Sequence, residues 1–126
     1  MNHQPEFHLQ RQVCNYLRLQ FPKVLFMSDT IASVKLNEQQ ALRNAYIQKK
    51  GFKCPDVIIF EPRHGYSGLF IELKTETPYK LNGELKKSDH LEGQEKTMKD
   101  LRQRGYFAQF AWSLEMAKDM IDKYFE

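Results

Sequence analysis

Three charged side chains stand in or beside two apolar runs that have the composition of β-strands. Asp56 comes directly before the run 57–60, and Glu72 and Lys74 lie at the end of the run 69–73. Both runs are rich in β-branched, aromatic and aliphatic residues, and the proline and glycines between them are typical of a turn. The pattern predicts a β-hairpin that carries two acids and one base.

Pairing of the two strands brings the acids together. We expect an antiparallel register in which Phe60 lies opposite Gly68. This register places Asp56 opposite Glu72, and Lys74 lies on the same face as Glu72. Directly opposed residues have Cβ atoms roughly 4.5 to 5.5 Å apart, so two like charges repel unless a cation lies between them. Mg²⁺ takes oxygen ligands and keeps several waters, so the pattern predicts a divalent-metal site beside a lysine that reaches the same water or phosphate.

The same pattern also has an ordinary explanation, because charged residues at strand ends are usually solvated or form weak surface ion pairs. The rest of the chain favours the functional interpretation. The net charge is only +3, but basic residues follow the hairpin closely. Such a distribution favours contacts with the phosphates of DNA. The residues expected to make these contacts are Lys53, Lys80, Lys86, Lys87 and Lys96.

Two further polar residues interrupt apolar helix faces. Glu6 lies three residues before Leu9 on the face of the first predicted helix, and Gln94 lies on the face of a later one. Glu6 is either an N-terminal charge that the helix dipole favours or a further ligand of metal or water. Gln94 either satisfies backbone groups or orients Lys74 or a phosphate. Both pairs of alternatives stay open.

Composition narrows the class of protein. The chain has 126 residues, which is enough for one domain with a real core over residues 1–126. Its apolar runs are strand-sized and its start lacks a signal-peptide pattern, so we expect a soluble cytoplasmic protein without membrane association. Cys14 and Cys54 are far apart and the four histidines are scattered, so neither a disulfide framework nor a structural zinc site is indicated. We expect the histidines to be exposed.

The first half of the chain has clear boundary signals. Pro5 fits the first turn of a helix that ends before Pro22, and residues 24–27 form a short apolar strand. Asn37 is expected to cap a second helix, with Gly51 as its left-handed stop.

The second half of the chain continues to alternate helices and strands. Residues 75–88 form a polar loop after the hairpin, and a capping box that starts at Asp89 begins a helix that ends before Gly105. A strand over residues 106–112 and a helix capped by Ser113 complete the chain. The predicted fold is α/β, with a mixed sheet of about four strands flanked by helices.

This order resembles the PD-(D/E)xK nuclease superfamily and, within it, the VRR-NUC domain of small phage proteins. The resemblance runs over nearly the whole chain, and it rests on residues 50–57, 65–74, Gln94 and residues 105–106. It implies a restriction-endonuclease-like core and an endonuclease that cleaves DNA, with Mg²⁺ or Mn²⁺ as cofactor. It further implies a homodimer that acts on branched or four-way-junction DNA.

The resemblance also implies roles for particular residues. Lys74 would position or activate the attacking water. The implied catalytic residues are Asp56, Glu72, Lys74, Glu6 and Gln94. The implied metal ligands are Asp56, Glu72, the Leu73 carbonyl and Glu6. Two alternatives remain, which are a non-catalytic DNA-binding or assembly module that retains this fold and an unrelated α/β protein whose acids form surface ion pairs.

Overall fold

A mixed four-stranded sheet forms the centre of the computed structural model, which describes residues 4–29 and 35–126. The strand order is β1-β2-β3-β4, with β1 and β2 antiparallel, β2 and β3 antiparallel, and β3 and β4 parallel. The parallel pair needs a crossover connection, which α3 supplies. The strands are β1 (Phe26–Ser28), β2 (Val57–Ile59), β3 (Leu69–Leu73) and β4 (Phe107–Ala111). The α/β fold class and mixed sheet predicted from the sequence are confirmed.

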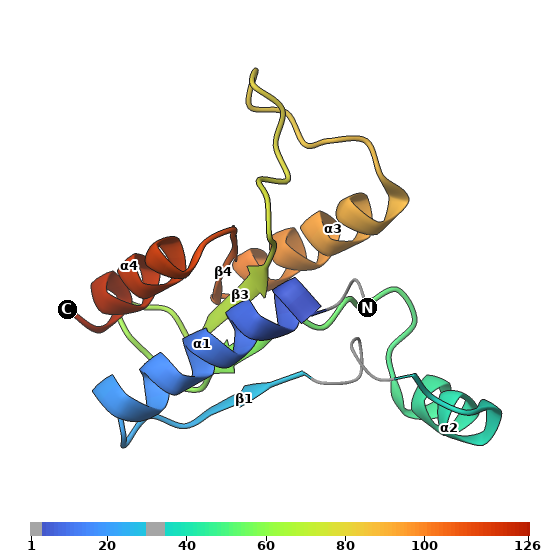
Figure 1. Cartoon of the computed structure of the whole chain (residues 1–126), viewed down its shortest axis with the longest axis horizontal. Coiled ribbons are helices and arrows are strands. Elements are labelled where there is room, and N and C mark those ends of the chain that lie inside the picture. The colour runs from blue at the N-terminus through green and yellow to red at the C-terminus, as the bar shows by residue number, and fades with distance from the viewer. Residues whose placement is uncertain (1–3, 30–34) are drawn as a thin grey trace.

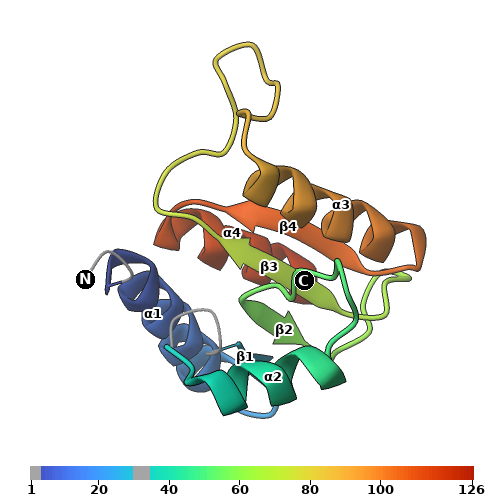
Figure 2. The same ribbon diagram turned by 90° about the vertical axis from the view of Figure 1, so that its right-hand side faces the viewer.

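Helices cover both faces of this sheet. Figures 1 and 2 show α1 and α4 packed on one face, with α3 on the other. The helices are α1 (Gln4–Gln20), α2 (Glu38–Ile47), α3 (Asp89–Gln103) and α4 (Leu114–Phe125). None of the helices within residues 4–29 and 35–126 is long and apolar enough to cross a membrane.

Alternation along β3 divides the core into two parts. Ile71 and Leu73 are buried in the larger cluster against α1 and α4, whereas Phe70 packs in a smaller cluster against α3. Successive side chains of a strand point to opposite faces, so Glu72 lies on the same face as Phe70. The strand therefore turns Glu72 toward Gln94, which α3 carries.

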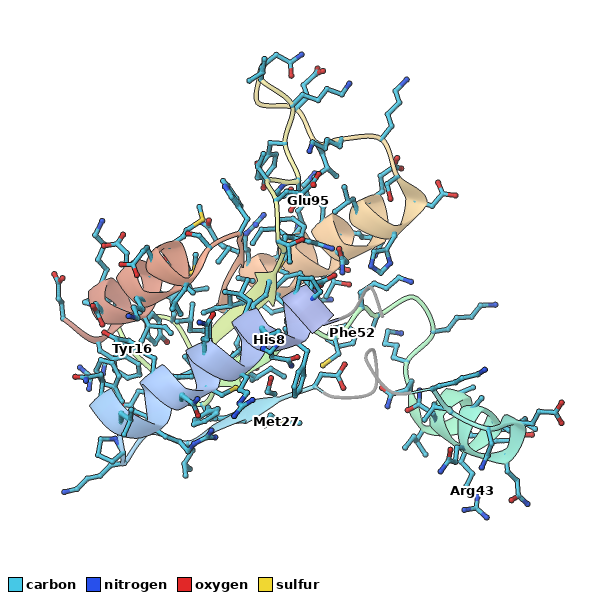
Figure 3. All side chains as sticks on the ribbon, viewed as in Figure 1. His8, Tyr16, Met27, Arg43, Phe52 and Glu95 are labelled. Carbon is cyan, nitrogen blue, oxygen red and sulfur yellow. The ribbon has the colours of Figure 1, made fainter. Side chains whose placement is uncertain are left out.

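The second helix differs from the prediction at its C-terminal end and in its packing. Asn37 caps α2 as expected, but the helix ends at Ile47 and its C-cap is Gln48, whose backbone is extended, so Gly51 is not its stop. The positive φ of Gly51 belongs to the following turn. No residue of α2 is buried, and Tyr46 is 84% exposed. Figure 3 shows Arg43 on this helix pointing away from the sheet.

The N-cap of α3 is Ser88 rather than Asp89. The Ser88 hydroxyl oxygen accepts a hydrogen bond of 3.3 Å from the backbone N–H of Leu91. Asp89 instead occupies the first turn of the helix, where the helix dipole favours its negative charge. Serine and aspartate are comparable caps, so two adjacent candidates made the predicted boundary one residue too late.

Candidate active site

The hairpin has the predicted register. Ile58 lies opposite Phe70, and continuing this register beyond β2 places Asp56 opposite Glu72. Asp56 Oδ2 accepts a hydrogen bond of 2.7 Å from the backbone N–H of Leu73. In an antiparallel pair the N–H and C=O of one residue point to the same neighbour, so the Leu73 carbonyl lies on the Asp56 side of β3.

Glu72 is a buried acid with an incomplete set of hydrogen bonds. Its side chain is 4% exposed, and Gln94 Nε2 donates a hydrogen bond of 2.8 Å to its Oε2. Neither Glu72 Oε1 nor Gln94 Oε1 has a partner among the described residues. Burial first, and then the neighbouring Asp56, raise the pKa of Glu72 to about 10. Burial also raises the pKa of Asp56. The two acids therefore lie together where neither ionises easily without a cation.

A pocket of about 310 Å³ lies beside these acids. Its walls come from segments that are far apart in the sequence, namely the start of α1, the end of β1, the approach to β2, the end of β3 and the start of α3. The candidate residues that line it are Glu6, Lys53, Asp56, Glu72 and Gln94.

Glu6 enters the pocket from the first turn of α1. Its charge is one of the causes that raise the pKa values of Asp56 and Glu72, so it lies within electrostatic reach of both acids. The same position also suits an acid that the helix dipole favours. The structure is thus compatible with both roles considered for this residue.

Lys74 does not line the pocket, but its charge reaches the acids. Its backbone N–H donates a hydrogen bond of 2.9 Å to the Ala111 carbonyl in β4, which extends the β3–β4 pairing by one residue. The Lys74 charge lowers the pKa values of both Asp56 and Glu72 and opposes the effect of burial. Gln94, by contrast, donates to Glu72 rather than to Lys74 or the backbone.

Sequence reasoning missed five residues that line the pocket. Gln10 is one turn after Glu6 and shares its face, which is a signal that could have found it. Its Nε2 donates hydrogen bonds to the carbonyls of Asp29 at 2.8 Å and Asp56 at 3.4 Å. The Ser28 hydroxyl also donates to the Asp56 carbonyl, at 2.6 Å, so the backbone that carries this acid is held from two sides. The missed lining residues are Phe7, Gln10, Asp29, Cys54 and His90.

Two of these missed residues have altered pKa values. Burial is the largest cause that raises the pKa of Cys54 to about 11, and the nearby carboxylates are a smaller one. The thiol therefore stays protonated at neutral pH. Burial, followed by the charges of Lys74 and Lys53, lowers the pKa of His90. His8, His64 and His90 are exposed, as expected from the sequence. His90 lies one turn before Gln94 on α3 and also lines the pocket beside the acids. His3 lies outside the described residues.

The predicted DNA-contacting lysines fall into separate places. Lys53 lines the pocket. Lys80, Lys87 and Lys96 line a second, shallower hollow of about 680 Å³ between the 75–88 loop and α3. Lys86 forms an ion pair of 3.3 Å with Glu76, and Lys96 forms one of 2.9 Å with Asp100. Exposed pairs of this kind contribute little to stability, so these lysines remain available to another anion.

The donor atoms at the pocket suit a hard cation. In residues 4–29 and 35–126, no group of three or more His, Cys, Asp or Glu side chains could hold a metal ion by itself. The candidate set is therefore two carboxylates and the Leu73 carbonyl, with water completing the shell. Mg²⁺ suits such a set because it keeps several of its waters and is commonly held by one or two carboxylates together with substrate phosphates. Glu72 Oε1, which lacks a hydrogen-bond partner among the described residues, would supply an oxygen ligand to such a cation once the Glu72 proton is displaced.

Comparison with known proteins supports the fold. No protein-family model matches the sequence, and no curated protein has significant similarity to it. Among solved structures, the chain is similar to a VRR_NUC domain protein, with a TM-score of 0.60 and 24% sequence identity over 94% of this chain and 86% of the other. At this identity the likeness concerns the fold, and the helix and strand order agrees with it. This chain therefore has the fold of a VRR-NUC domain.

Proposed function

We propose that this chain is a metal-dependent DNA endonuclease that uses Mg²⁺ or Mn²⁺, with residues 1–126 forming one nuclease domain. The observation that carries the proposal is the buried pair of Asp56 and Glu72 beside an open pocket, with one Glu72 oxygen unpartnered. When both opposed acids are ionised they repel each other and a phosphate, and without a cation this repulsion adds to burial in raising their pKa values. A protein that only bound DNA would gain nothing from this arrangement, whereas a cation between the acids reverses its effect. The VRR_NUC likeness supports the same chemistry.

Each residue has a role in this proposal. Asp56, Glu72 and the Leu73 carbonyl would hold the cation, and Glu6 would add a further oxygen through water. Gln94 keeps Glu72 in position through its 2.8 Å hydrogen bond. A divalent cation held there would offset the charge that builds on the phosphate oxygens and lower the pKa of a nearby water. Lys74 provides a second positive charge, and it positions or activates the attacking water.

The proposal is tested by incubating the protein with supercoiled, linear, single-stranded and four-way-junction DNA. Each substrate is combined with Mg²⁺, Mn²⁺ or EDTA. We expect phosphodiester cleavage with either metal, none in EDTA, and the highest rate on branched DNA. A protein that binds these substrates with similar affinity in every condition and cuts none of them would instead be a binding or assembly module.

We also propose that the active form is a homodimer, since a chain of 126 residues offers little surface with which to grip two duplex arms of a junction. The sheet offers a surface for association. Met27 lies opposite Ile58 on the face that carries Phe70, but α3 packs on β3 and β4 and leaves the β1 side open. Leu25, Met27 and Phe60 share that open side and are 71%, 49% and 52% exposed. Contiguous exposed apolar side chains of this kind are typical of interaction sites.

Replacing Met27 with Glu is expected to convert the dimer to a monomer, because a charge would be buried in the apolar interface. Light scattering after size-exclusion chromatography measures the mass of wild type and variant at the same concentration. Leu81→Glu, on the fully exposed tip of the 75–88 loop, is the matched control and is expected to leave the mass unchanged. A wild type that is monomeric at micromolar concentration in the presence of junction DNA would exclude the dimer.

A further inference from the structure

A glycine in α3 leaves a slot that the stem of Lys53 fills. A Cβ atom at Gly93 would lie 3.0 Å from Lys53 Cε and 3.6 Å from its Cγ. A separation of 3.0 Å is closer than most Cβ contacts, so a side chain at this position would push against the lysine stem. Glycine in a helix interior lowers stability relative to alanine. The helix thus gives up stability where the lysine crosses it.

The backbone of Lys53 is fixed to the same helix. Its N–H donates a hydrogen bond of 3.0 Å to the Thr97 hydroxyl oxygen, and Thr97 is 2% exposed. Thr97 follows Gly93 by four residues and therefore lies on the same face of α3. Lys53 is thus held at two points one helical turn apart, at its backbone and along its stem.

Lys53 also forms part of the pocket wall. Lys53 lines it together with Asp56, Glu72 and His90. The seven ion pairs among the described residues do not include Lys53. The charge of Lys53 also contributes to the lowered pKa of His90, which places the Lys53 ammonium within electrostatic reach of that ring. A cation without an ion-pair partner among the described residues, beside an acidic pocket, is available to an anionic ligand.

We propose that Lys53 binds a phosphate of the DNA strand that enters the pocket, and that Gly93 is the residue that positions it. The inference rests on the nuclease function proposed above and assigns a substrate contact within it. A free lysine side chain loses much rotamer freedom when it binds a phosphate. A stem already seated in the Gly93 slot has lost part of that freedom beforehand, so the contact is stronger. The ammonium also offsets the repulsion between the phosphate and the acids.

The test separates stability from function by comparing Gly93→Ala, Lys53→Met and the double variant with wild type. Methionine has a similar unbranched stem without the charge. DNA affinity is measured with Ca²⁺, which also takes oxygen ligands, over a range of salt concentrations, and cleavage is measured with Mg²⁺. Thermal unfolding and Mn²⁺ binding are measured on the same samples. Lys23→Met, on an exposed residue between α1 and β1, is the control for one lost surface charge.

Gly93→Ala is expected to raise the melting temperature by roughly 2–5 °C. It should nevertheless weaken DNA binding and cleavage roughly tenfold, the scale of one charge-assisted hydrogen bond. Lys53→Met should weaken DNA binding and cleavage by a similar factor. It should also reduce the slope of log affinity against log salt by about 0.9, as for one phosphate contact. The double variant should be no weaker than Lys53→Met alone, and all variants should bind Mn²⁺ as wild type does.

Two outcomes would overturn the inference while leaving the nuclease function intact. One is wild-type binding and cleavage in both single variants, provided that wild type itself cuts DNA. The other is a further tenfold loss when Gly93→Ala is added to Lys53→Met, because Gly93 would then act through something other than the lysine. A wild type that neither binds nor cuts DNA would instead contradict the nuclease function itself.

Discussion

Asp56→Asn is expected to reduce DNA cleavage in Mg²⁺ or Mn²⁺ by roughly a thousandfold or more, equivalent to about 4 kcal/mol of transition-state stabilisation. The amide has nearly the size of the carboxylate, and its oxygen can still accept the hydrogen bond that Leu73 donates. The fold is therefore retained, but the negative charge that attracts the cation is lost. Single-turnover cleavage of the preferred substrate measures the effect, and thermal unfolding checks the fold.

Asp119→Asn makes the same chemical change on the exposed side of α4. Asp119 forms only a surface ion pair with Lys123, at 3.1 Å, so its replacement should leave the cleavage rate within about twofold of wild type. Lys74→Ala should reduce cleavage as Asp56→Asn does, because the positive charge of Lys74 acts on both acids. Cleavage by Asp56→Asn or Lys74→Ala at the wild-type rate in Mn²⁺ would refute the assignment of the active site.

The hairpin was the part of the site most accessible from sequence. Strand alternation and the turn residues define the register of Asp56 and Glu72, because a slip by one residue would turn every apolar side chain to the wrong face. Local signals also identified most helix ends, including Ser113 as the cap of α4. These features depend on neighbours in the chain or on one strand pair, so little tertiary information is needed.

The remaining walls of the pocket depend on how distant elements pack. His90 and Cys54 reach the acids only because the start of α3 and the approach to β2 meet there, and no local pattern encodes that meeting. The slot at Gly93 is similar, since the sequence shows a helix glycine but not the lysine that lies across it. The apolar residues of α2 show a different limit. Leu42 and Tyr46 have helical spacing, but the spacing does not say whether the face meets the core or another chain.

The buried acids also predict how stability depends on pH. The pKa of Glu72 is raised from its ordinary value of 4.5 to about 10 in the folded chain. A carboxyl group with a raised folded pKa binds its proton more tightly when folded, so folding loses stability as pH rises from the unfolded value toward the folded one. Removing this group should therefore stabilise the metal-free protein at neutral pH, and the gain should disappear near pH 4.5 and below.

Glu72→Gln is accordingly expected to raise the free energy of unfolding of the metal-free protein by on the order of 3 kcal/mol at pH 7.5. The new amide also has an N–H that the unpartnered Gln94 Oε1 could accept. Denaturant unfolding in EDTA at pH 4.5 and 7.5 measures this change and its pH dependence. Gln94→Glu, which adds an acid beside Glu72, should have the opposite sign at pH 7.5. Equal stabilities of wild type and Glu72→Gln at both pH values would contradict the raised pKa.

Excess Mn²⁺ should make wild type more stable than Glu72→Gln, which reverses their order in the absence of metal. Wild type is expected to gain about 4.1 kcal/mol at a metal concentration about one thousand times its dissociation constant, whereas Glu72→Gln should gain almost nothing. The wild-type gain should also grow with pH, because a metal bound by Glu72 must displace the proton that burial favours. An acid that lowers stability without metal and is required for stabilisation by metal acts as a ligand, whereas one that makes only a surface ion pair would have neither effect. The metal-dependent change in relative stability therefore distinguishes a metal centre from the ion-pair alternative, even before any DNA is cut.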